Sequence, residues 1–471
     1  MSLIKFGTDG WRAIIAKDFT VDNVARVSLA TADWLLRNFD NPSCVIGYDC
    51  RFGGAMFAET TAKVLAQKGI KVFLHADGPV STPMVSLGVK HKQASLGVVI
   101  TASHNPPTYN GYKLKGYFGG PLLPKEIAEV EATIPDENLM SLDSLTLQEF
   151  IDAGKVEFVN LEEMYVEHAQ AFFDMDMIEK SGLNFAYDAM YGAGQFAMRT
   201  LLPDATFLHA EMNPGFEGTA PEPILKNLLE LQEVIRLSED IDCSLATDGD
   251  ADRLGLFDKE GNFIDSHHII LLLIHYLVKY KGMSGKVVTA FSVTDRVKKM
   301  CEHYGLEQET VKIGFKYVAG HFLDEDVLLG GEESGGIAVK GHIPERDGIW
   351  MGLMIWEFMA KSGKSLSELI QEVYEIVGSF SFNRNDMHIT EELKQKAMKA
   401  CADGQFTSFG DRKIRRVEDV DGFKFHFDND EWLMIRPSGT EPVLRTYAES
   451  SDEAGVEALL KDCEAAILAL A

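Results

Sequence analysis

The chain has 471 residues, and a rule of roughly 150 residues per domain predicts about three domains. Its hydrophobic fraction of 46% and charged fraction of 25% are ordinary for a folded globular protein. The net charge of -27 argues against a surface for nucleic acid or an anionic membrane, so an anionic substrate would need cations gathered inside its own site.

The six cysteines are scattered without a Cys-x-x-Cys spacing, which indicates neither a disulfide framework nor a zinc site. The N-terminus lacks the architecture of a signal peptide, and the longest apolar run, residues 269–274, is too short to span a membrane. We therefore expect a cytoplasmic protein with no membrane partner.

Residues 1–150 are predicted to form a first α/β domain. Residues 43–49 and 70–75 have the composition of strands, and residues 55–67 between them have helical periodicity. The strand–helix–strand order favours a parallel or mixed sheet.

The apolar run Val98–Ile100 stops abruptly at the turn-forming sequence Thr101-Ala-Ser-His-Asn-Pro. Ligands bind at strand ends in α/β sheets, so Ser103 is a candidate nucleophile. Turn chemistry alone also accounts for serine, asparagine and proline at this place. Asn110-Gly111 then predicts a hairpin turn, with Lys113 just beyond it.

Residues 151–260 are predicted to form a second α/β domain, with a strand over 183–188 and a helix over 221–237. Asp248, Asp250 and Asp252 occupy alternate positions, so an extended chain would direct all three carboxylates to one point. Three hard oxygen anions suit Mg²⁺. An EF-hand is excluded because Arg253 stands where that loop requires glycine. A solvated acidic turn remains the alternative.

Residues 261–376 are predicted to form a third α/β domain, with a helix over 266–281 and a strand over 286–290. In the stretch from Gly330 to Gly336, Glu332 and Ser334 place a carboxylate and a hydroxyl among glycines. That pair can hydrogen-bond adjacent hydroxyl groups of a polyol.

Residues 377–471 are predicted to form a smaller α+β domain, with strands over 423–427 and 432–435 and a final helix over 452–470. The loop after the second strand contains a guanidinium group, two hydroxyls and backbone N–H groups, which together suit a phosphate; its residues are Arg436, Ser438, Gly439 and Thr440.

A hydroxyl nucleophile, a site for a hard cation, a polyol-binding loop and an anion-binding loop together describe phosphoryl transfer on a sugar. In order and spacing, these stretches and the early sequence Phe6-Gly-Thr-Asp-Gly-Trp-Arg12 resemble the α-D-phosphohexomutases, the phosphoglucomutase/phosphomannomutase superfamily. The resemblance covers essentially the whole chain. It implies three similar mixed-sheet α/β domains and a C-terminal α+β lid domain, arranged around a central cleft.

The resemblance also implies a mechanism. The resting enzyme would have a phosphate on Ser103, and one phosphoryl oxygen would join the three aspartates around Mg²⁺. Transfer to a hexose phosphate gives a hexose 1,6-bisphosphate, which also serves as activator. The catalytic candidates are Ser103, His104, Lys113, Arg12 and Lys316, and the substrate-binding candidates are Glu332, Ser334, His342, Arg346, Arg253, Arg436, Ser438, Gly439 and Thr440.

The sequence departs from some bacterial members of the superfamily at Gly336, where those proteins have a histidine proposed as a base. His342 is the substitute that we consider.

The stretches Asp-Gly-Asp-Ala-Asp and Gly-Glu-Glu-Ser are more similar to glucose and mannose enzymes than to glucosamine ones. We therefore expect glucose phosphate as substrate and mannose phosphate as a second one. A phosphoglucosamine mutase, a sugar-phosphate phosphatase and a non-catalytic sugar-phosphate sensor remain alternatives. Its partners would be small hexose phosphates, and the chain would be a monomer or a homodimer.

Overall fold

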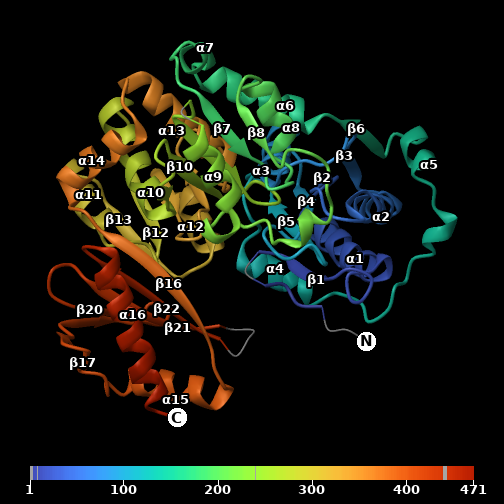
Figure 1. Cartoon of the computed structure of the whole chain (residues 1–471). Coiled ribbons are helices and arrows are strands. Elements are labelled where there is room, and N and C mark those ends of the chain that lie inside the picture. The colour runs from blue at the N-terminus through green and yellow to red at the C-terminus, as the bar shows by residue number, and fades with distance from the viewer. Residues whose placement is uncertain (1–3, 8, 239, 439–442) are drawn as a thin grey trace. The chain divides into compact units, whose positions relative to one another are not determined.

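The computed structural model describes residues 4–7, 9–238, 240–438 and 443–471 (Figure 1). The chain divides into two compact units. The N-terminal unit runs to Val288 and includes Gly314–Ile370, and the C-terminal unit comprises Thr289–Ile313 and Gln371–Ala471. Within the described residues, no helix is both long and apolar enough to cross a membrane.

The first sheet of the N-terminal unit is mixed and has the strand order β1-β5-β4-β2-β3-β6. β2 runs parallel to β3 and β4, whereas β5 is antiparallel to both β1 and β4. The strands are β1 (Trp11–Ile14), β2 (Ser43–Tyr48), β3 (Lys71–His75), β4 (Leu96–Ile100), β5 (Tyr109–Gly116) and β6 (Val156–Val159). The mixed sheet that the sequence predicted is confirmed.

Helices cover both faces of this sheet. α1 and α2 lie beside each other (Figure 1) and pack on the face that contains Cys44 and Ile46. α3 packs on the opposite face, where its Gly88 approaches Val45. The helices of this region are α1 (Val21–Asn38), α2 (Gly54–Gln67), α3 (Thr82–His91), α4 (Pro124–Glu131) and α5 (Leu147–Asp152).

The predicted hairpin turn at Asn110-Gly111 is wrong, because both residues lie inside β5. Gly111 pairs with Arg12 of β1. A Cβ on Gly111 would collide with the carbonyl oxygen of Thr101 and lie 2.8 Å from that of Trp11. Glycine is therefore required here by the close approach of neighbouring strands rather than by a turn.

The second sheet has the order β11-β10-β9-β7-β8. β7 is parallel to β8 and β9, and β9 forms an antiparallel hairpin with β10. The strands are β7 (Phe185–Asp188), β8 (Thr206–Leu208), β9 (Cys243–Thr247), β10 (Leu254–Asp258) and β11 (Phe263–Ile264). The three aspartates thus lie in the short connection between β9 and β10.

The helices around the second sheet are α6 (Leu161–Phe172), α7 (Met175–Glu179), α8 (Gln195–Leu201) and α9 (Leu229–Leu237). The helix predicted over 221–237 is shorter than expected, since only α9 and a single 3₁₀ turn at Leu225–Asn227 form. Pro223 disfavours the helical conformation at the residue before it, Glu222, which opposes an earlier start of the helix.

The remaining part of the N-terminal unit contains an antiparallel pair of strands, β14 and β15, beside two apolar helices, α10 and α13. Its elements are α10 (Ser266–His275), a π-helical turn (Tyr276–Tyr280), α12 (Phe315–Asp324), β14 (Val327–Gly331), β15 (Ile337–Val339) and α13 (Gly348–Ser362). β12 (Lys286–Ala290) and α14 (Leu366–Val377) continue the chain from one unit into the other.

The C-terminal unit is built on an antiparallel sheet of order β16-β22-β21-β20-β19. α15 and α16 pack on one face of it, and α16 lies across β22 (Figure 1). Helices segregated to one face of an antiparallel sheet define an α+β domain, as predicted. The elements are α11 (Arg296–Tyr304), β13 (Gln308–Val311), β16 (Ser381–His388), α15 (Glu391–Ala402), β17 (Ser408–Phe409), β18 (Arg412–Lys413), β19 (Arg416–Glu418), β20 (Phe423–His426), β21 (Trp432–Pro437), β22 (Val443–Ser450) and α16 (Glu453–Leu468).

His209 joins three elements of the second sheet region. Its Nδ1 lies 3.0 Å from both carboxylate oxygens of Asp188, at the end of β7, and its Nε2 lies 3.3 Å from Glu230 in α9. The hydrogen bond with Asp188 and the nearby negative charges raise the pKa of His209 to about 9. The imidazolium form is therefore favoured in the folded protein at neutral pH.

The first prediction tests the close approach at Gly111. Gly111→Ala should lower the free energy of unfolding by about 1–3 kcal/mol, because the new Cβ overfills the space between strands. Gly320→Ala in α12 is the matched control, since nothing lies within 4 Å of its added Cβ and alanine favours a helix. Denaturant unfolding compares them, and equal midpoints for the two variants would contradict this account.

The second prediction concerns pH. A histidine whose folded pKa is raised from its unfolded value of about 6.5 stabilises the fold fully below pH 6.5 and loses that effect as the pH rises through about 9. The difference in unfolding free energy between the wild type and His209→Gln should therefore be larger at pH 6 than at pH 10. A difference that does not depend on pH over this window would refute it.

Candidate active site

Ser103 lies in the loop that follows β4 and precedes β5, as the sequence predicted. Its side chain is buried, and its N–H donates to Oγ1 of Thr101 at 2.9 Å. Its φ of 53° falls in the left-handed region, which costs an L residue roughly 1–2 kcal/mol. The surrounding contacts therefore hold this residue in a strained conformation.

The hydroxyl of Ser103 contacts two groups that can accept its proton. Oγ donates to Oδ2 of Asp248 at 2.7 Å and lies 3.2 Å from Nδ1 of His104. Burial holds the pKa of His104 well below its usual value, and the positive charges of Arg253 and Arg12 lower it further. A neutral imidazole therefore lies beside the hydroxyl at neutral pH.

The aspartates Asp248, Asp250 and Asp252 converge in the turn between β9 and β10. All three are fully buried, and one carboxylate oxygen from each lies within 4.8 Å of the others. Asp250 Oδ1 and Asp252 Oδ1 accept no hydrogen bond from the described part of the chain. Burial, together with the charges of the other two, raises the pKa of Asp248 well above its usual value. Mg²⁺ prefers carboxylate oxygens as ligands, and these two buried Oδ1 oxygens accept no hydrogen bond from the described residues that would compete with it. The three aspartates therefore fit that ion.

Two buried cations neutralise part of this negative charge. Lys113 Nζ lies 2.7 Å from Asp250 and 3.0 Å from Asp252, and the guanidinium of Arg346 lies 2.6 Å from Asp252. Burial lowers the pKa of Lys113, but the surrounding carboxylates raise it above its usual value overall. Lys113 is therefore a fixed positive charge in this arrangement.

Asp9 belongs to the same cluster and was missed from the sequence. It lies 2.8 Å from Lys113 Nζ and also contacts Arg346. A further pair, Lys115 and Glu345 at 2.8 Å, is fully buried beside it. Asp9 stands in the stretch Phe6–Arg12 and Glu345 directly precedes Arg346, so only their adjacency to the chosen residues could have indicated them.

Packing explains why glycine stands at position 336, where some bacterial members of the superfamily have a histidine. A Cβ there would collide with Cδ of Arg346 and lie 2.9 Å from its Cγ. Because Arg346 is buried and paired with Asp252, it cannot move aside freely. The arginine thus occupies the space that a side chain at position 336 would need.

Other predicted residues surround this centre. Arg12 donates to Oδ1 of Asn105 at 2.7 Å, and Arg253 lies 3.9 Å from Asp252. Glu332 is buried and accepts from the N–H of Gly314 at 2.9 Å. Burial raises its pKa, although Arg346 and Arg253 oppose that effect.

Two remaining members of the predicted set are more open. Ser334 is partly exposed in the same loop as Glu332. Lys316, also partly exposed, lies with its Nζ 5.5 Å from the centre of the Tyr317 ring.

His342 lies in a different cluster. Its Nε2 is 3.0 Å from Asp347, its Nδ1 is 3.3 Å from His168, and its ring stacks on Trp350 at 3.7 Å. These contacts join α6 to the start of α13. None of them involves Ser103 or the three aspartates.

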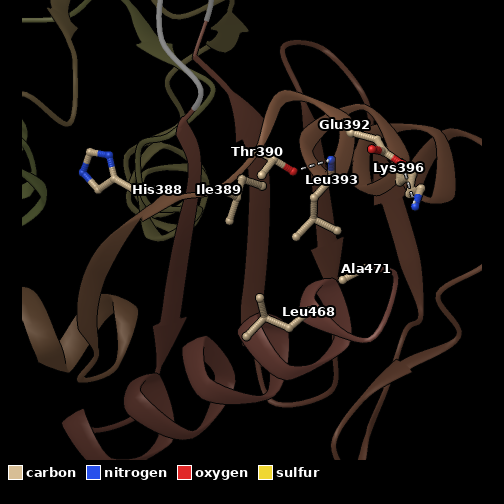
Figure 2. A pocket seen from close by; sticks show the side chains of 8 residues that line it. All are labelled: His388, Ile389, Thr390, Glu392, Leu393, Lys396, Leu468 and Ala471. Atoms are coloured by element: carbon tan, nitrogen blue, oxygen red, sulfur yellow. Dashed lines mark hydrogen bonds and ion pairs between the residues drawn. The ribbon is translucent and has the colours of Figure 1, made fainter.

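The C-terminal unit contains the predicted anion-binding loop. Arg436, in β21, lies 3.3 Å from Asp421, and the buried Ser438 donates its N–H to the carbonyl of Val443 at 2.9 Å. Gly439 and Thr440 lie outside the described residues. A separate pocket of this unit lies beside α15 and the end of α16 (Figure 2), with Leu393, Lys396 and Leu468 among its lining residues. None of the predicted site residues that the structure describes is among its lining residues.

Four family models match consecutive parts of the chain. Residues 3–140, 163–261 and 265–377 match phosphoglucomutase/phosphomannomutase alpha/beta/alpha domains I, II and III, and residues 391–466 match the C-terminal domain of the same family. Together these matches cover most of the chain.

Known proteins are similar over nearly their full length. A phosphoglucomutase/phosphomannomutase of Thermococcus kodakarensis is 29% identical, with 95% of each chain covered. A probable phosphoglucosamine mutase of Pyrococcus furiosus is 30% identical, with 97% of this chain and 96% of the relative covered. The crystal structure of a putative phosphomannomutase from Thermus thermophilus superposes with a TM-score of 0.87 at 32% identity, covering 99% of both chains. The chain therefore belongs to the phosphoglucomutase/phosphomannomutase family.

Proposed function

We propose that this hexose-phosphate mutase interconverts hexose 1-phosphate and hexose 6-phosphate through a phosphorylated Ser103 and a hexose 1,6-bisphosphate. The observation that supports this proposal is the contact of the Ser103 hydroxyl with Asp248, one of three convergent buried carboxylates. A nucleophile in contact with a cation site is what phosphoryl transfer requires.

Asp248, Asp250 and Asp252 would hold Mg²⁺, with an oxygen of the phosphorylated Ser103 as a further ligand. When bound, the ion supplies positive charge to the phosphoryl group as it is transferred. Lys113 and Arg346 add fixed positive charge beside the aspartates. The chain thereby concentrates cations at one point of a protein whose net charge is -27.

The two half-reactions use the same serine oxygen. In the first, the bond from phosphorus to Ser103 Oγ breaks while a bond forms from phosphorus to the free hydroxyl of the hexose phosphate. That hydroxyl loses its proton and Oγ gains one. In the second, a bond forms from the other phosphorus of the bisphosphate to Oγ while its bond to the sugar oxygen breaks, so Oγ gives up its proton and the sugar oxygen gains one. His104 is neutral and 3.2 Å from Oγ, so we assign it the proton exchanged with the serine.

Most of the other candidates bind the substrate in this proposal. Glu332 and Ser334 would bond neighbouring hydroxyls of the sugar, and Arg12, Arg253 and Lys316 would bind phosphate oxygens. In the C-terminal unit, Arg436, Ser438, Gly439 and Thr440 would hold the phosphate that is not being transferred. His342 would keep the position of Asp347, since its ring nitrogens are bonded to Asp347 and His168.

We favour glucose phosphate, with mannose phosphate second and glucosamine phosphate as the alternative. The sequence feature behind this preference was partly Ala251, which has a φ of 55° and is fully buried in the turn between β9 and β10. Alanine or glycine at this position therefore affects the turn, and the preference depends more on the loop of Glu332. Of the similar proteins described above, one is named a phosphoglucomutase/phosphomannomutase and another a probable phosphoglucosamine mutase. The preferred sugar must therefore be measured by an activity assay.

The third prediction is the activity itself. The protein should convert glucose 1-phosphate to glucose 6-phosphate in a coupled assay, and turnover should require both Mg²⁺ and a trace of glucose 1,6-bisphosphate. Mannose 1-phosphate and glucosamine 1-phosphate, run in parallel, rank the sugars. Release of inorganic phosphate in place of isomerisation would support a phosphatase. Binding of sugar phosphates without turnover would support a sensor.

The fourth prediction separates the nucleophile from sugar recognition. Ser103→Ala should reduce kcat at least about 1000-fold, because it removes the atom that accepts the phosphate. Glu332→Gln should lower kcat/KM by about 10- to 100-fold, as expected for the loss of a charge-assisted hydrogen bond, and should change the ranking of sugars. Steady-state kinetics measure both, and equal residual activities would rule out these roles.

A further inference from the structure

We propose that Arg51 is a positioning residue for phosphoryl transfer: it fixes the loop of Ser103 by binding four of its backbone carbonyl groups. The proposal rests on the role proposed above for Ser103. No substrate contact is required of Arg51, which acts through the serine.

The guanidinium of Arg51 makes four hydrogen bonds to one short loop. Nη2 donates to the carbonyl oxygens of Ser103 and Asn105, both at 2.6 Å. Nη1 donates to those of Pro106 and Tyr109, at 2.9 and 3.0 Å. The loop from Ser103 to the start of β5 is therefore bound along its length by a single buried side chain.

The sequence of this loop explains why an arginine is needed. Pro106 and Pro107 have no N–H groups and cannot donate to a carbonyl of the loop, whereas the N–H of Tyr109 donates to the carbonyl of Pro106 at 3.0 Å. Arginine offers several donors in a planar fork and no acceptor, which matches a set of carbonyl oxygens. A lysine ammonium has the same charge, but its donors are on one nitrogen atom and cannot reach four separate carbonyl oxygens.

A second series of contacts joins Arg51 to Ser103 through side chains. Arg51 Nε forms an ion pair with Asp49 Oδ2 at 3.2 Å, and neither side chain is exposed. The same oxygen accepts from Oγ1 of Thr101 at 2.5 Å, and that Oγ1 accepts the N–H of Ser103 at 2.9 Å. Asp49 and Thr101 each follow directly after one of the adjacent parallel strands β2 and β4. Ser103 is thus held at both its N–H and its carbonyl.

Neighbouring residues protect these contacts. The ring of Phe216 lies 5.1 Å from the Arg51 guanidinium carbon, and Phe216 packs with Cys50, Tyr191 and Ala193 in a buried cluster. Hydrogen bonds to a charged group in such surroundings are stronger than those exposed to water. A loop held in this way can retain the strained φ of Ser103.

The metal-binding turn depends on the same position. A Cβ on Gly249, between Asp248 and Asp250, would lie 2.6 Å from the carbonyl oxygen of Ser103. The turn therefore packs directly against the carbonyl that Arg51 binds, and this close approach places Ser103 Oγ 2.7 Å from Asp248. A displacement of the serine by about 1 Å can reduce a rate by about 100-fold, so small errors in this loop matter. Both half-reactions need Oγ at the same place, once as leaving group and once as nucleophile.

The fifth prediction tests Arg51 with a matched control. Arg51→Lys should lower kcat by about 100-fold while KM for the hexose 1-phosphate stays within about 2-fold, because the substrate contacts remain. The ³¹P signal of phosphorylated Ser103 should shift, and inorganic phosphate released per turnover should rise as the misplaced phosphoryl group meets water. Arg26→Lys is the control, since Arg26 is also buried and also donates to a loop carbonyl, that of Pro135, at 2.7 Å. It should change stability alone.

A second variant covers the case in which Arg51→Lys does not fold. Thr101→Val keeps the shape but removes the hydroxyl between Asp49 and Ser103, and it should lower kcat by about 10-fold with KM unchanged. Amide exchange of the peptide 101–110 gives a readout that needs no activity, and it should quicken in Arg51→Lys but not in Arg26→Lys. Absence of a phosphoserine in the wild type would overturn the function proposed for Ser103. Wild-type kcat and unchanged exchange in Arg51→Lys would overturn the role of Arg51 while leaving that function intact.

Discussion

Three carboxylates confined within 4.8 Å in a buried turn repel one another, and the N-terminal unit is arranged to compensate for that repulsion. Burial would raise the pKa of Asp250, yet Lys113 and the hydroxyl of Thr82, 2.5 Å away, lower it overall. At Asp248 the charge of Arg253 does not outweigh burial and the other two carboxylates, so its pKa is raised instead. The cluster therefore has unequal carboxylates, and the one with the raised pKa is the one that contacts the serine.

The compensating groups come from distant parts of the chain. Asp9 and Arg346 are 337 residues apart in sequence, and Lys113 is 137 residues from Asp250. The site therefore forms only when the first sheet, the β9–β10 hairpin and the segment before α13 have all folded together. A cluster of buried charges built in this way is coupled to the stability of the whole N-terminal unit, since removing one partner leaves the other charge buried and unpaired.

The close approach of backbone segments is a second constraint on the site, and glycines in the metal-binding turn and in the loop of Glu332 satisfy it. Gly249 lies against the Ser103 carbonyl, and Gly336 leaves room for the stem of Arg346. Ala251, by contrast, adopts a left-handed conformation that glycine would adopt more easily. The residue type at these positions is therefore constrained by backbone geometry.

The sequence by itself determined the fold class, the strand end at Ser103, the acidic turn and the family, because these depend on local patterns and on the order of stretches along the chain. The reason given for the convergence of the aspartates was wrong: a tight turn between β9 and β10, not alternation along a strand, brings them together. The sequence Asn110-Gly111 was also misassigned to a turn. Asn-Gly is typical of hairpin turns, but here the glycine is required inside a strand by the close approach of neighbouring backbone. Only the tertiary structure revealed the contacts of Asp9 and Arg51, because their partners lie on other segments and the pairing of buried charges produces no periodic pattern in a single sequence.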